Sequence, residues 1–81
     1  KMRDYSKLDY NELSYLDFEE ITEEQAEQLK ANELISYWEY IDNYVKHCNN
    51  GYCHDYENVL LAIVREEGEE DLLLHFIIKE G

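Results

Sequence analysis

The longest regular pattern in the chain runs from Glu33 to Cys48, where apolar residues recur at alternating intervals of four and three positions. The opposite half of a helical wheel is polar throughout, whereas a period of two would mix apolar and polar side chains on one face. Asn32 suits the start of a helix, and Gly51 suits its exit. The segment therefore predicts a central amphipathic helix that belongs to the core. Its apolar stripe consists of Leu34, Trp38, Ile41, Val45 and Cys48.

Two shorter helices are predicted upstream by their capping patterns. Asp9 and Glu12 have the spacing of a capping box for a helix from Tyr10 to about Leu16, and Thr22 with Gln25 has it for a helix from Glu23 to about Ala31. Residues 8–48 are thus expected to be helical. Residues 1–7 carry no periodic pattern, so we expect a frayed end there.

Two apolar runs follow, at residues 59–64 and 72–78, and a polar loop with Gly68 joins them. Short runs joined in this way predict an antiparallel β-hairpin over residues 57–79. A helical hairpin is the alternative, but the runs are short for helices and Gly68 interrupts them. Both strands are apolar on both faces. One face should pack on the central helix, and the other needs the N-terminal helices, a second copy of the chain or a partner.

These elements predict an α+β fold with two short N-terminal helices, one central amphipathic helix and a C-terminal antiparallel β-hairpin. With 81 residues, the chain (1–81) is expected to be a single small domain. It contains no run of about 20 apolar residues and no apolar stretch behind its N-terminal charges, so we expect a cytoplasmic protein. Three helices and a hairpin also outline a winged helix-turn-helix, but its recognition helix would be acidic, which argues against DNA binding.

The net charge of the chain is the property that bears most on its function. Twenty Asp and Glu against seven Lys and Arg give a net charge of −13. Such a surface repels nucleic acids and anionic membranes and attracts basic proteins. Between Leu8 and Leu29 there are eight acids and no lysine or arginine. Helix dipoles explain some acids in first turns, but not the missing bases. Selection for solubility or for life in high salt would also produce such an excess.

One cluster of soft ligands, the sequence HCNNGYCH, suggests metal chemistry. It supplies His47, Cys48, Cys53 and His54, which zinc could use as four tetrahedral ligands. Four ligands in so short a loop are crowded, however, and Cys48 already belongs to the apolar stripe, so free thiols are favoured over zinc or a disulfide. Asn-Gly also marks tight hairpins, which would pair Cys48 with Cys53, but the upstream helical pattern outweighs that interpretation.

The sequence carries no motif of a known reaction: it has no glycine-rich phosphate loop, nucleophile elbow, zinc-protease helix or calcium loop. We therefore predict a protein that is not an enzyme and has no cofactor. The acidic surfaces are the best candidate for function, because carboxylates can take the place of duplex phosphates in a nucleic-acid-binding groove. A solvated surface that only keeps the chain soluble is the competing interpretation. The candidate partner-binding residues are Asp17, Glu19, Glu20, Glu23, Glu24, Glu27, Tyr40, Glu66, Glu67, Glu69 and Glu70.

In size, charge and lack of motifs the chain resembles inhibitors encoded by phages and mobile elements, such as anti-restriction DNA mimics and anti-CRISPR proteins. The resemblance is one of composition, and no motif residue carries it. We therefore predict an acidic inhibitor of a basic nucleic-acid-binding protein, with no direct contact to nucleic acid or membrane. The alternative is a small homodimeric structural or regulatory adaptor assembled through the C-terminal hairpin.

Overall fold

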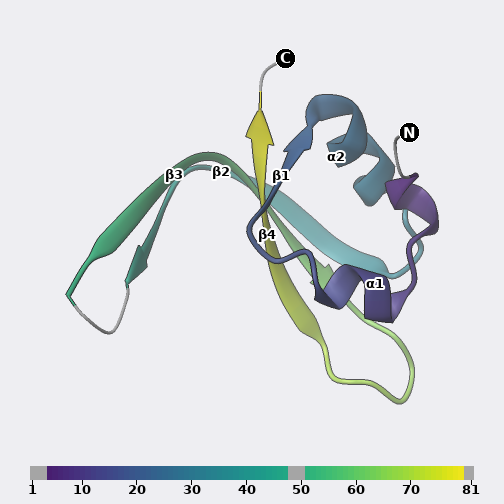
Figure 1. Cartoon of the computed structure of the whole chain (residues 1–81). Helices are drawn as coiled ribbons and strands as arrows, with labels where there is room; N and C mark the ends of the chain where they lie inside the picture. The colour runs from purple at the N-terminus through teal and green to yellow at the C-terminus, as the bar shows by residue number, and fades with distance from the viewer. Residues whose placement is uncertain (1–3, 48–50, 80–81) are drawn as a thin grey trace.

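The computed structural model describes residues 4–47 and 51–79 and consists of a four-stranded mixed sheet with short helices packed on it (Figure 1). The helical elements come early in the chain, and three of the four strands come late. In chain order the elements are η1 (Tyr5–Lys7), α1 (Tyr10–Ser14), β1 (Glu19–Thr22), α2 (Glu23–Lys30), β2 (Ile35–His47), β3 (Cys53–Val64) and β4 (Leu72–Lys79).

The strands lie in the order β1-β4-β3-β2, with β1 parallel to β4 and the other neighbours antiparallel. Only the second half of β3, Val59–Val64, pairs with β4. The first half of β3 pairs with β2 alone, and the two strands continue together beyond the rest of the sheet as a two-stranded arm (Figure 1). Asn58, where the two halves of β3 meet, has a positive φ of 57°. This left-handed residue marks the bend at which the arm leaves the sheet.

The core lies between the helices and one face of the sheet. On that face, Leu60 pairs with Phe76 and Ala62 pairs with Leu74, and all four side chains are buried. The helical layer closes over them with buried side chains from η1, the η1–α1 connection, α1, the α1–β1 connection and α2. These side chains are Tyr5, Leu8, Leu13, Leu16, Ala26 and Leu29. Burial of apolar surface on this face is the main source of stability.

The opposite face of the sheet is covered only in part. Phe18, with a positive φ of 65°, stacks on the ring of His75 at a centroid distance of 4.5 Å. From the arm, Tyr44 approaches the same His75 ring at 4.7 Å. Farther along this face Leu73 is 54% exposed and Tyr37 is 52% exposed. The sheet therefore has one covered face and one face that is half open.

The predicted fold class is wrong, because the segment expected to be the central core helix is strand β2. It is a 13-residue edge strand, and none of its residues is buried. Trp38, predicted to lie in the core, is 41% exposed, and Val45 is 40% exposed. Seven of the thirteen residues are β-branched or aromatic, which favours an extended chain. The absence of alternating apolar and polar residues did not exclude a strand here, because both faces of this edge strand are exposed to solvent and neither has to be apolar.

Several local predictions agree better with the structure. Both capping boxes are present, Asp9 with Glu12 for α1 and Thr22 with Gln25 for α2. The apolar runs of the predicted hairpin form β3 and β4, which pair antiparallel, but within a larger sheet and with β3 beginning earlier, at Cys53. The expected fraying does not hold for η1, where Tyr5 is buried, whereas residues 1–3 lie outside the described residues. In the part of the chain that the structure describes, no helix has the length and apolar character of a membrane span.

Candidate functional site

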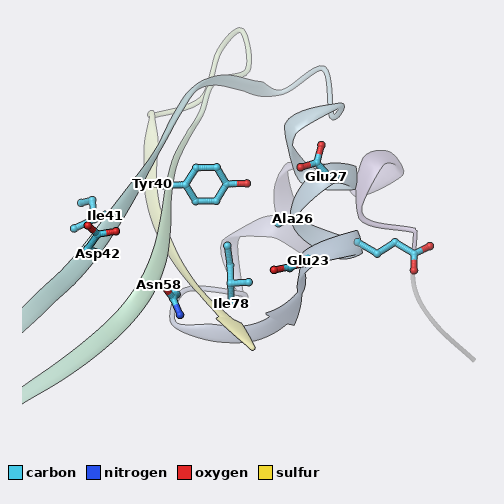
Figure 2. A pocket seen from close by; sticks show the side chains of 9 residues that line it. Glu23, Ala26, Glu27, Tyr40, Ile41, Asp42, Asn58 and Ile78 are labelled. Carbon is cyan, nitrogen blue, oxygen red and sulfur yellow. The ribbon is translucent and has the colours of Figure 1, made fainter. Parts of the chain in front are cut away.

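A groove with a volume of about 540 Å³ lies between helix α2 and the bend of strands β2 and β3 (Figure 2). One wall comes from α2 and the other from β2, so residues far apart in the sequence meet across it. Apolar side chains from α2, β2 and β4 line its base, and carboxylates surround them. The lining residues are Glu23, Glu24, Ala26, Glu27, Tyr40, Ile41, Asp42, Asn58 and Ile78.

The acidic wall is positioned by the capping box of α2. The Thr22 side chain accepts from the Gln25 backbone N–H at 3.1 Å, and the Gln25 side chain accepts from the Thr22 N–H at 2.9 Å. These bonds begin the helix at Glu23, so Glu23 and Glu24 occupy its first turn, where the helix dipole favours carboxylates. The dipole thus compensates part of the cost of bringing these charges together.

The opposite wall is built around Tyr40, whose ring projects from β2 toward α2 in Figure 2. The ammonium of Lys30 lies 2.8 Å from the Tyr40 hydroxyl and 2.6 Å from Oε2 of Glu27. It also lies 4.6 Å from the centroid of the Trp38 ring and 4.9 Å from that of Tyr40. The pKa of Lys30 is raised above its usual 10.5, most strongly by the hydrogen bond to Glu27 and next by the hydrogen bond to Tyr40. The end of the groove next to Tyr40 thus already binds one ammonium group of the chain itself.

The charged side chains that line the groove are all negative. Its lining includes four carboxylates, and among the described residues that line it there is no lysine, arginine or histidine. Lys30 compensates Glu27 only. The apolar base, with Ala26 and Ile78, suits the methylene stem of a long cationic side chain, while the carboxylates suit its head group. The arrangement can therefore bind lysine or arginine side chains of a partner.

The structure brings four of the predicted partner-binding residues together here: Glu23, Glu24, Glu27 and Tyr40. The predicted loop residues Glu66, Glu67, Glu69 and Glu70 lie between β3 and β4, at the end of β4 opposite to the groove. Eight residues of strand separate these two ends, which corresponds to about 23 Å. The predicted acidic residues therefore form two separate surfaces.

Two of the remaining predicted residues, Asp17 and Glu20, have partners within the chain. The Asp17 carboxylate accepts a hydrogen bond from the His75 backbone N–H at 2.8 Å and lies 2.9 Å from His75 Nδ1. It thereby fixes the α1–β1 connection to β4. Glu20 on β1 lies 3.4 Å from the ammonium of Lys79, while Glu19 is exposed on the same strand. Asp17 has a structural role in these contacts, and neither glutamate lines the groove.

Three residues that line the groove were not predicted from the sequence: Ile41, Asp42 and Ile78. Ile41 was expected to face the core, because the segment that carries it was interpreted as a helix. The β-branched and aromatic content of residues 35–45 was the signal for the strand. Sequence reasoning also missed the pair of Asp17 and His75, whose members are 58 positions apart in the sequence.

Of the HCNNGYCH segment, the structure describes His47 at the end of β2 and Cys53 and His54 at the start of β3. His47 pairs with Cys53 across the two strands, and the Cys53 Sγ lies 3.3 Å from His47 Nδ1. A hairpin thus does connect these residues, although with a register one position away from the Cys48–Cys53 pairing that a tight Asn-Gly turn would give. Cys48 lies outside the described residues, so the expectation of free thiols, with zinc and a disulfide as the alternatives, stays a prediction. Among residues 4–47 and 51–79, no group of three or more potential ligands is arranged to hold a metal ion.

No protein-family model, curated protein or solved structure matches this chain.

Proposed function

We propose that the chain is a non-enzymatic acidic inhibitor that binds a basic nucleic-acid-binding protein in the cytoplasm, and that the groove between α2 and β2 is its main contact. The observation that supports the proposal is the convergence of Glu23, Glu24, Glu27 and Asp42 around an apolar base. Cationic side chains that normally contact phosphates would bind these carboxylates instead. A phage or mobile-element DNA mimic of the anti-restriction or anti-CRISPR type would act in this way.

Capture from a host lysate at low salt, followed by elution with rising salt, tests the proposal. A basic nucleic-acid-binding protein should elute, and DNA or RNA should compete for it. The purified target should then lose its nucleic-acid binding when the chain is added in equal amounts. Affinity that does not change between low and moderate salt would contradict the proposal, because contacts between exposed charges are screened.

A pair of matched variants tests the groove itself. Changing Glu23, Glu24 and Glu27 to glutamine removes three charges from the groove, and changing Glu66, Glu67 and Glu69 to glutamine removes three from the loop. The groove variant should lose about 2 kcal/mol of binding free energy, or about thirtyfold in affinity. The loop variant should lose much less. Equal losses would mean that overall charge, and not the groove, determines binding.

The second candidate function is the homodimeric adaptor, favoured by the half-open face of the sheet. There Tyr37, Ile63 and Leu73 pair across β2, β3 and β4, and Leu73 is 54% exposed. If this row is a dimer interface, Leu73→Ser should give a monomer without loss of monomer stability, as measured by sedimentation and urea denaturation. Sedimentation of the unchanged chain as a monomer at high concentration would exclude this candidate.

A further inference from the structure

The outer edge of β2 is an open edge of the sheet. Strand β2 is the last strand of the sheet, and within the described residues its only strand neighbour is β3. In an antiparallel pair, the backbone N–H and C=O groups point alternately toward the neighbour and away from it. About half of the backbone groups along its 13 residues therefore face outward. They form a row of donors and acceptors that another strand can pair with.

Most proteins protect such edges, and this chain protects β2 mainly by charge. The opposite edge strand, β1, has four residues and leads directly into α2, so it offers little to pair with. Strand β2, in contrast, contains no proline, and its pairing with β3 is interrupted only between Ile35 and Tyr37 and at the bend, where Asp42 and Asn58 are not paired. Short strands, prolines, bulges and charged side chains are the usual means of preventing edge pairing, and β2 carries the charged residues Glu39, Asp42 and Lys46. A long open edge is therefore a candidate for recognition by strand addition.

The charge around this edge indicates what would pair with it. Glu39 and Asp42 are exposed on β2 itself, and the acidic wall of α2 lies beside it across the groove. A second copy of the chain, with its net charge of −13, would be repelled. The aromatic side chains of the strand also bind cations, because Trp38 and Tyr40 hold the Lys30 ammonium against their rings.

We infer that β2 accepts an extended, basic segment of the partner as a fifth strand. This inference rests on the proposed function and adds the mode of binding to it. Main-chain hydrogen bonds to the outer edge of β2 supply affinity that does not depend on sequence. Side chains of the added strand alternate between the two faces. Those on the helix side lie next to Trp38, Tyr40 and the acidic groove, and those on the other side lie next to Tyr37 and Glu39.

The test uses two synthetic peptides of eight residues in which lysine and threonine alternate. The second peptide carries N-methyl groups on four consecutive residues, which removes N–H donors from both edges of a strand but leaves the charge unchanged. Affinity is measured by the fluorescence of Trp38, the only tryptophan of the chain and a residue of β2. Backbone hydrogen exchange of β2 is measured with and without each peptide.

The unmodified peptide should bind at low salt, protect β2 amides from exchange, and bind at least tenfold more tightly than the N-methylated peptide. Equal binding of both peptides would overturn strand addition and leave the acidic groove and the proposed function intact. Binding of neither peptide would also overturn it, and capture from lysate would then decide the proposed function separately. Protection of β2 that rises with the concentration of the chain alone would show that a second copy, and not a basic segment, covers the edge.

Discussion

Replacing Lys30 with methionine removes the cation that joins α2 to β2 while keeping most of the volume of the side chain. Only 16% of the Lys30 side chain is exposed, and its ammonium contacts Glu27, Tyr40 and Trp38. An ion pair three positions apart on a helix contributes about 0.3 kcal/mol. The cation–π contacts add about 0.5 to 1 kcal/mol at a partly exposed site. We therefore expect Lys30→Met to lower the free energy of unfolding by about 1 kcal/mol.

Urea denaturation followed by far-UV circular dichroism measures this loss, and the melting temperature should fall by about 4–8 °C. Lys79→Met is the matched control, because it makes the same change in charge at an exposed pair with Glu20, where the side chains are 59% and 65% exposed. The control should change stability by less than about 0.5 kcal/mol. If both variants are equally stable, the contacts of Lys30 do not stabilise the fold, and our reasoning about this end of the groove is wrong.

The same substitution should have the opposite effect on binding. Without Lys30, the Glu27 carboxylate and the Tyr40 hydroxyl become available to a cation of the partner, so affinity for a lysine-rich peptide should rise several-fold. The pKa of Lys30 is raised in the folded chain. Its contribution to stability is therefore complete below its unfolded pKa and is lost as the pH rises through the raised value. The difference in stability between the two proteins should hold at neutral pH and shrink only above about pH 10.5. Weaker peptide binding by Lys30→Met would refute the view that Lys30 occupies a cation site.

Three further predictions concern the fold. Thr22→Ala removes the acceptor for the Gln25 N–H and should cost about 1 kcal/mol in urea denaturation; no loss would mean that the capping box does not stabilise α2. Asn58→Val places a β-branched residue at a positive φ and should cost about 1–2 kcal/mol, whereas Asn58→Gly should stay within about 0.5 kcal/mol of the parent; similar stabilities would contradict the left-handed bend. The hydrogen bond from Arg65 lowers the pKa of Asp71 in the folded chain. The contribution of the ionised Asp71 carboxylate to stability is therefore present above its unfolded pKa and is lost as the pH falls through the lowered value. Thermal melts of Asp71→Asn should therefore differ from those of the parent at pH 5 and less so at pH 2, and a difference independent of pH would exclude this linkage.

Local signals in the sequence were sufficient for the elements that depend on near neighbours. A capping box involves residues three positions apart, and this is why Thr22 and Gln25 marked the start of α2 correctly. The apolar runs around Leu60 and Phe76 were recognisable as strands because they are short, apolar on both faces and bounded by polar residues. The excess of acidic residues follows directly from the composition. None of these features requires knowledge of what lies across the molecule.

The secondary structure of residues 35–47 does not follow from the sequence of that segment alone. Their apolar spacing matches a helix face, while their β-branched and aromatic residues favour a strand. The tertiary structure settles the conflict, because Leu13, Leu29 and their neighbours already cover the helical face of the sheet. The remaining open edge of β3 offers backbone hydrogen bonds along a strand, and β2 satisfies them.

In the candidate site, too, some features follow from the sequence and others only from the tertiary structure. The sequence by itself determined that Glu23, Glu24 and Glu27 share a helix and that no basic residue lies among them. Only the tertiary structure placed Tyr40 and Asp42 opposite that helix, since the strand that carries them is held there by its pairing with β3. Composition fixed the charge of this protein, whereas long-range strand pairing decided where that charge surrounds a groove.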